Sequence, residues 1–86
     1  MRNLAAIYYF YILQSQRDGS YYLGQTSNLQ ARLERHQQGR SRYTRNRRPW
    51  KLVYYEEFAT RSEAMRRERE CKAKHSKIFI EQLIRN

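Results

Sequence analysis

Five side chains of this sequence are suited to chemistry at a phosphate group, and they are spread over three segments of the chain. A phenol or an imidazole can transfer protons, a guanidinium binds phosphate oxygens through planar donors, and a carboxylate can hold a divalent cation. No one of these residue types is diagnostic, so the elements that carry them must turn them toward one place. The five residues are Tyr11, Tyr22, Arg32, His36 and Glu68.

The two tyrosines lie on the strands of a predicted β-hairpin, whose turn is marked by Asp18-Gly19. Because side chains alternate along a strand, Tyr11 and Tyr22 share a face whether the loop is Asp18-Gly19 or the longer segment 15–18. With the longer loop they lie directly opposite each other. Gly24 falls on the same face and leaves it open. The alternative that both tyrosines are core residues with satisfied hydroxyls stays open at this point.

A helix is predicted for residues 29–38, because capping residues precede this segment and a glycine follows it. Leu29 and Leu33 define its buried stripe, and Arg32 and His36 fall on that stripe by helical spacing. Burying a guanidinium is costly without an anionic partner. Arg32 therefore either pairs with a carboxylate of the protein or points into a cleft that takes a phosphate.

A second inward charge is expected on a later helix, which a capping box over residues 60–63 predicts. Ala64, Glu68 and Cys71 share one face of that helix. Glu68 could be the ion-pair partner of Arg32, or it could hold a divalent cation. Cys71 has no Cys or His at zinc-ligand spacing and is expected to be a buried apolar residue. A single cysteine also fits a reducing, cytoplasmic location.

These patterns predict one α+β domain over residues 1–86, with a small three-stranded antiparallel sheet flanked by helices in the order ββαβαα. His75 is expected at the surface near a helix boundary. The expected strands are residues 6–14, 20–25 and 50–58; the expected helices are residues 29–38, the segment from the capping box to about residue 74, and a last helix that is capped by Ser76 and buries Phe79, Ile80, Leu83 and Ile84.

The formal net charge of +10 predicts a polyanionic partner, with nucleic acid as the leading candidate. A membrane is disfavoured, because the chain has neither a basic amphipathic helix with an exposed Leu or Trp face nor an apolar run of about 20 residues. Tyr43 and Trp50 could stack on exposed bases, with the alternative that Trp50 packs in the core. Contacts to a phosphate backbone are predicted for Arg40, Arg42, Arg45, Arg47 and Arg48.

The ordered set of residues resembles the GIY-YIG nuclease domain, over nearly the whole chain from about Tyr9 to Ile84. The first motif is present as Tyr9-Phe10-Tyr11 and the second as Tyr22-Leu23-Gly24. Tyr9, Phe10 and Leu23 depart from the family pattern, but both tyrosines and the glycine are kept. The helix signature "NLQARLERH" supplies the arginine and the histidine, and "EAMRRERECK" supplies the glutamate. The chain most resembles the small stand-alone members of that family.

The resemblance implies a divalent-metal-dependent endonuclease that hydrolyses phosphodiester bonds in DNA. It implies that Glu68 binds one metal ion, with Mg²⁺ expected and Mn²⁺ as the alternative, and that Arg32 binds the phosphate. Tyr11 is then the candidate general base, Tyr22 orients water or phosphate, and His36 either shares the base role or hydrogen-bonds Tyr11. Two alternatives remain at this stage: a nucleic-acid-binding protein that keeps the fold without cleaving, and a structural domain whose charge is incidental.

Overall fold

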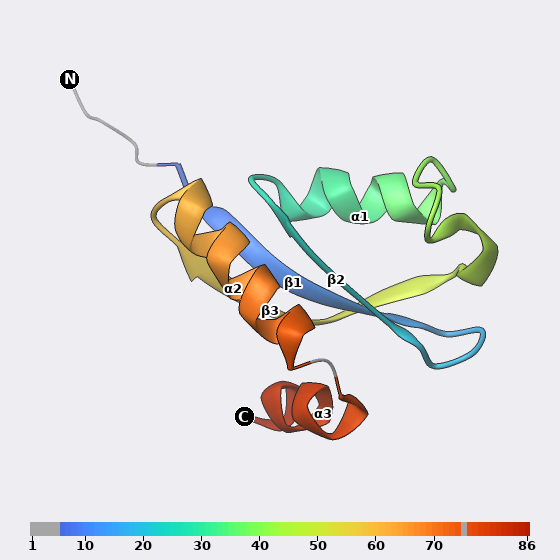
Figure 1. The fold of residues 1–86 in the computed structure, drawn as a ribbon. Coiled ribbons are helices and arrows are strands. Elements are labelled where there is room, and N and C mark those ends of the chain that lie inside the picture. The colour runs from blue at the N-terminus through green and yellow to red at the C-terminus, as the bar shows by residue number, and fades with distance from the viewer. Residues whose placement is uncertain (1–5, 75) are drawn as a thin grey trace.

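The computed structural model describes residues 6–74 and 76–86, so the prediction for His75 lies outside the described residues. The order ββαβαα is confirmed, with one short 3₁₀ turn inserted before the third strand (Figure 1). The elements are β1 (Tyr8–Ser15), β2 (Tyr21–Thr26), α1 (Leu29–Gln37), η1 (Arg45–Arg47), β3 (Trp50–Phe58), α2 (Arg61–Ala73) and α3 (Lys77–Arg85).

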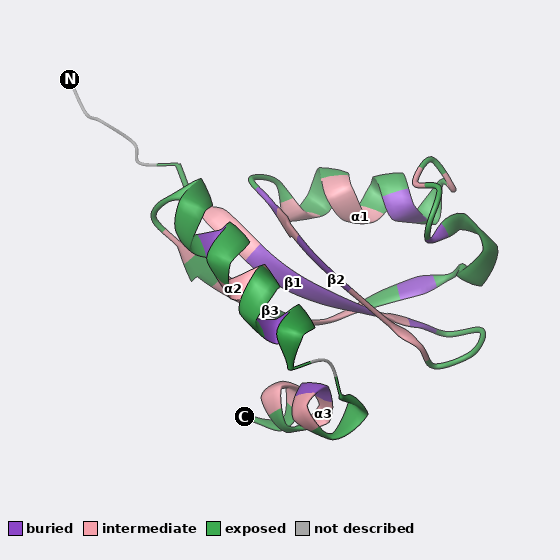
Figure 2. Ribbon diagram, in the orientation of Figure 1, coloured by how far each residue is buried: buried purple, intermediate pink, exposed green. Residues whose placement is uncertain are grey.

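The sheet is antiparallel with the strand order β2-β1-β3, so β1 is the central strand. Side chains alternate along β1, and the two faces of the sheet consequently support two separate apolar clusters. Phe10 and Ile12 pack with Cys71 of α2 and Ile80 of α3. On the other face, Tyr11 packs with Leu13 and Trp50, and α1 adds its leucines to this second cluster. Figure 2 shows that burial is concentrated along the strands, whereas the outer surfaces of the helices are exposed.

The hairpin register differs from both sequence-based possibilities. Tyr11 pairs with Gly24, and Leu13 pairs with Tyr22, and residues 16–20 connect the two strands. The two tyrosines therefore share a face, as predicted, but they lie diagonally rather than directly opposite each other. The Ser15 hydroxyl accepts hydrogen bonds from the backbone of Arg17 and Asp18, and this local turn sets the register.

Each helix begins directly after a capping residue that the sequence predicts. Asn28 accepts a hydrogen bond from the backbone of Ala31 at the start of α1, and both bonds of the predicted capping box are present at Thr60 and Glu63. Ser76 caps α3 as expected. The α2 prediction is also confirmed at its inward face, since Ala64 and Cys71 are fully buried.

A pair of side-chain hydrogen bonds fixes the loop between α1 and β3. The Gln37 amide donates to the backbone carbonyl of Trp50 at 2.6 Å and accepts from the backbone N–H of Trp50 at 2.8 Å. Trp50 is 3% exposed and its indole N–H donates to the carbonyl of Thr44. Trp50 is therefore a core residue, and only Tyr43 of the two aromatic candidates remains available for stacking.

Candidate functional site

The candidate site is built around Tyr11, whose ring crosses the edge strand β2 at its glycine. A Cβ atom on Gly24 would lie 2.6 Å from the Tyr11 hydroxyl oxygen and 2.7 Å from Cζ. No side chain other than the hydrogen of glycine fits at this close approach. Gly24 therefore lets the Tyr11 phenol cross over β2 in close contact with its backbone.

The Tyr11 hydroxyl is the first member of a buried hydrogen-bonded chain. It lies 3.1 Å from His36 Nε2, and His36 Nδ1 lies 2.8 Å from the Thr44 hydroxyl. All three side chains are about 1% exposed. The Thr44 hydroxyl also makes a long hydrogen bond, at 3.5 Å, to the carbonyl of Ser41. If Thr44 donates to that carbonyl, its oxygen accepts from the His36 Nδ1–H, and Nε2 is left to accept the Tyr11 proton.

The protonation states follow from burial and charge. Burial, and then the positive charges of Arg32 and Arg35, lowers the pKa of His36 to about 4. Burial and the neighbouring Tyr22 raise the pKa of Tyr11 above its usual value, whereas Arg32 acts in the opposite direction. At neutral pH the resting pair is therefore a neutral phenol beside a neutral imidazole. The predicted link between His36 and Tyr11 is present as a direct hydrogen bond.

Arg32 lies on the same side of the sheet as Tyr11, and its positive charge is close enough to lower the pKa of Tyr11. Within residues 6–74 and 76–86, no carboxylate lies at ion-pair distance from Arg32. The sequence left open an ion pair between Arg32 and Glu68, and the structure does not form it. A half-buried guanidinium with unused planar donors is suited to bind an oxyanion such as a phosphate.

Glu68 reaches the site from α2, and its charge acts on Tyr11. Its side chain is 21% exposed, and Lys72, one turn later, donates to it at 2.5 Å. In the part of the chain that the structure describes, no three His, Cys, Asp or Glu side chains gather as a metal-binding group. One carboxylate fits a Mg²⁺ ion that takes its other ligands from water and substrate phosphate, because Mg²⁺ usually binds in this way.

Tyr22 completes the group. Its ring is centred 4.9 Å from the His36 ring and 6.3 Å from the Tyr11 ring, and the residue is half-buried. The structure thus places Tyr11, Tyr22 and His36 in one group with Arg32 beside them, and Glu68 on α2 lies near enough for its charge to act on Tyr11.

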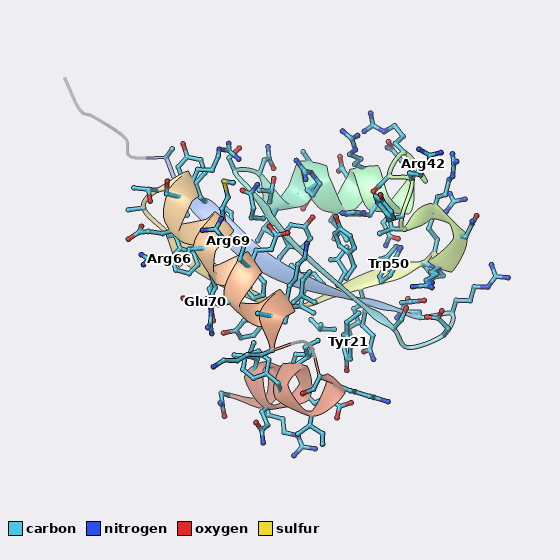
Figure 3. All side chains as sticks on the ribbon, viewed as in Figure 1. Tyr21, Arg42, Trp50, Arg66, Arg69 and Glu70 are labelled. Carbon is cyan, nitrogen blue, oxygen red and sulfur yellow. The ribbon has the colours of Figure 1, made fainter. Side chains whose placement is uncertain are left out.

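The predicted phosphate-contacting arginines lie on the loop after α1, where Figure 3 labels Arg42. Among the described residues, Arg40, Arg42 and Arg45 have no acidic partner, and all three are exposed. Arg47 makes an exposed ion pair with Asp18 at 3.5 Å. Arg48 is used differently, because its guanidinium donates to the backbone carbonyls of residues 45 and 37 and packs on residue 39.

Thr44 is the member of the site that sequence reasoning missed. It follows an arginine and a tyrosine in a loop, where no helical or strand periodicity marks inward positions. Its backbone carbonyl and its hydroxyl take part in hydrogen bonds with Trp50, six residues later, and His36, eight residues earlier, and these bonds exist only when the loop is folded. No signal in the local sequence distinguishes this threonine from a solvated loop residue.

The fold and the five convergent side chains define a class of protein: the chain belongs to the GIY-YIG family. Residues 7–82 match the family described as the GIY-YIG catalytic domain, which is a nuclease-type domain and implies a nucleic-acid substrate. The family assignment and the fold expected from the resemblance are confirmed. The described helices are too short and too polar for any of them to span a bilayer.

The more particular relatives are small proteins that share the name UPF0213. The chain is 45% identical over 80 residues to a UPF0213 protein of Bacillus pumilus, covering 88% of this chain and 81% of that one. It is 48% identical over 68 residues to a UPF0213 protein of Staphylococcus haemolyticus, covering 78% and 82% respectively. The solution NMR structure of a UPF0213 protein from Bacillus halodurans aligns with a TM-score of 0.57 at 40% identity, covering 91% of this chain and 82% of that one.

Proposed function

We propose that this protein is a divalent-metal-dependent endonuclease that hydrolyses phosphodiester bonds in DNA, acting on branched, nicked or damaged forms. The observation that carries this proposal is the Tyr11 hydroxyl hydrogen-bonded to a neutral His36, beside an Arg32 with no carboxylate partner among the described residues. Such a group combines a proton acceptor with an oxyanion binder, and in the described part of the chain no carboxylate forms an ion pair with that binder.

In the proposed reaction, Arg32 binds the non-bridging oxygens of the scissile phosphate and stabilises the charge that develops on them. The attacking water transfers a proton to the Tyr11 oxygen while Tyr11 passes its own proton to His36 Nε2. The water oxygen forms the new bond to phosphorus as the bond to the leaving oxygen breaks. The anionic phosphate also offsets the positive charge of Arg32, which favours a proton on His36. Tyr22 orients the water or the phosphate from the open side of the pair.

Glu68 is the proposed ligand of the metal ion, for which Mg²⁺ is expected and Mn²⁺ is the alternative. When bound, such an ion would supply Lewis-acid stabilisation of phosphate and leaving-group charge. For the protein, the consequence is that the Glu68 carboxylate must exchange Lys72 for the cation.

Residues 38–49, which join α1 to β3 and are called the arginine loop below, supply the proposed DNA contacts. Arg40, Arg42, Arg45 and Arg47 present exposed guanidinium groups, which bind the backbone without reading sequence. Affinity should therefore fall steeply with salt, since each neutralised phosphate releases counterions.

The test is to incubate the protein with supercoiled, nicked and branched DNA in Mg²⁺ or Mn²⁺, and with a chelator. Glu68→Ala should abolish cleavage and retain most of the binding, whereas Glu70→Ala, an exposed change on the same helix, should cut normally (Figure 3). Salt-sensitive binding without any metal-dependent cleavage would overturn the proposal. It would favour the non-catalytic nucleic-acid-binding alternative.

A further inference from the structure

A groove of about 590 Å³ runs beside the candidate site and has not been assigned a role. It is lined by Tyr22, Tyr43, Asn46, Arg47 and Lys72, which come from β2, the arginine loop and α2. Its volume lies within the roughly 300–1,000 Å³ typical of small-molecule sites. Two of its walls belong to the candidate site, since Tyr22 packs on His36 and Lys72 binds Glu68. A strand held at the scissile phosphate would therefore continue directly into this groove.

Tyr43 is the unusual member of the lining. It is 82% exposed, although the next residue, Thr44, is buried in the hydrogen-bonded chain. Tyr43 belongs to neither apolar cluster, so its ring is not needed for the packing of the fold. Single exposed aromatic residues are common and mean little by themselves. This one, however, lines a groove whose other polar members can bind phosphate and can hydrogen-bond a base edge.

The charge of the groove selects an anionic occupant. Arg47 and Lys72 are its ionisable basic members, and their present partners are exposed or half-buried carboxylates that an incoming phosphate can replace. Asn46 offers both a donor and an acceptor, the pattern that matches the edge of a nucleobase. A flat ring, an amide and two cations together fit one nucleotide, with its base on Tyr43 and its phosphate on the cations.

We infer that this groove is a subsite for an unpaired nucleotide adjacent to the scissile phosphate, with its base stacked on Tyr43. The inference rests on the proposed nuclease function and narrows its substrate class. A base within a duplex is already stacked and paired, so it can enter the groove only after extrusion, which costs energy. A single-stranded or frayed segment needs no extrusion. The protein should therefore prefer DNA that is unpaired at the point of cleavage.

The experiment measures binding in the presence of chelator, so that it does not depend on catalysis. A single-stranded oligonucleotide containing 2-aminopurine and the matching duplex are titrated with the full chain and with Tyr43→Ala, Tyr43→Phe and Tyr55→Ala. Tyr43→Ala should weaken single-strand binding by roughly 5- to 100-fold, the loss expected for one stacked base, and abolish the quenching of 2-aminopurine. Tyr43→Phe keeps the ring and should bind like the unchanged protein. Tyr55→Ala, which removes a half-exposed tyrosine on β3, should also bind normally.

An equal loss of affinity on both DNA forms would overturn the subsite, because it would indicate a general effect on the loop. Unchanged single-strand binding by Tyr43→Ala would also overturn it. If the subsite fails but Mg²⁺-dependent cleavage is present, the proposed function stands. If stacking is observed but no metal supports cleavage, the subsite stands and the nuclease proposal falls.

Discussion

Two clusters in this protein combine a tyrosine, a carboxylate and an arginine, and they are organised in opposite ways. In the cluster between β3 and α2, Tyr54 donates to Glu56, and Arg67 binds the same carboxylate through two hydrogen bonds at 2.8 and 3.0 Å. In the candidate site, Arg32 and Glu68 do not pair; Glu68 takes Lys72 instead.

The burial of the carboxylates does not separate the two clusters. The Arg67 and Glu56 side chains are 28% and 22% exposed, and Glu68 is 21% exposed. What differs is pairing: the first cluster pairs its own charges, whereas the Arg32 guanidinium has no carboxylate partner within residues 6–74 and 76–86. Residue type and carboxylate burial therefore do not distinguish the candidate site from the other cluster. The two clusters are distinguished by whether their arginine and carboxylate pair with each other.

The largest expected difference between the two clusters comes from removing the arginine from each. Arg32→Ala should lower cleavage by roughly 100- to 1,000-fold, because a donor to the developing charge is lost, and should change the unfolding free energy little. Arg67→Ala should do the reverse, with nearly normal cleavage but a loss of about 1–3 kcal/mol, since Glu56 is left half-buried without its partner. Initial cleavage rates and urea unfolding measure both effects. Equal effects of the two variants on cleavage rate and on unfolding free energy would contradict the distinction between the two clusters.

A smaller effect is expected from Gly24→Ala, which tests whether the site needs the close approach of Tyr11. The added methyl group must displace the phenol ring, and a shift of the order of 1 Å in a reacting group can cost about 100-fold in rate. Overpacking should also cost about 1–3 kcal/mol of stability. Gln25→Ala, the next residue of β2 and on the opposite face, should leave the rate unchanged. Normal cleavage by Gly24→Ala would show that the position of Tyr11 does not matter.

The smallest effect is a difference in acid stability. The pKa of His36 falls from 6.5 to about 4 on folding, so between these pH values the unfolded chain binds the extra proton and stability declines as the pH is lowered. Burial raises the pKa of Glu56, but the hydrogen bonds from Arg67 and Tyr54 lower it by more, so its pKa in the folded protein lies below the usual value of 4.5. The stability that Glu56 contributes is therefore lost only below that pH. Urea unfolding midpoints are measured as a function of pH. In His36→Gln the decline in the midpoint between pH 6.5 and about 4 should disappear. In Glu56→Gln the decline below pH 4.5 should disappear. A profile that His36→Gln leaves unaltered would contradict the neutral buried imidazole.

Local patterns predicted most of the fold and the element on which each of the five candidate residues lies. The capping box at Thr60 and the helical spacing of Arg32 and His36 depend on neighbours within one or two turns, so they can be read directly from the sequence. Alternation placed Tyr11 and Tyr22 on one face for the same reason. The sequence could not predict that Arg32 and Glu68 do not pair with each other, because that depends on how two distant segments are placed. It could not predict that Thr44 is buried, because no helical or strand periodicity marks inward positions in its loop. The predicted hairpin register was wrong, because a turn stabilised by the Ser15 hydroxyl forms in place of a two-residue turn at Asp18-Gly19.

The Gln37 amide, with its two bonds to the backbone of Trp50, has a consequence for association. Because this amide joins the end of α1 to the start of β3, residues 38–49 form a loop that is held at both ends, not a solvated arm. A disordered basic segment loses conformational entropy when it docks on a polyanion, and that loss offsets part of its Coulombic attraction. Here the loop is ordered on folding, so the proposed binding of its guanidinium groups to a phosphate backbone would carry less of this entropic cost.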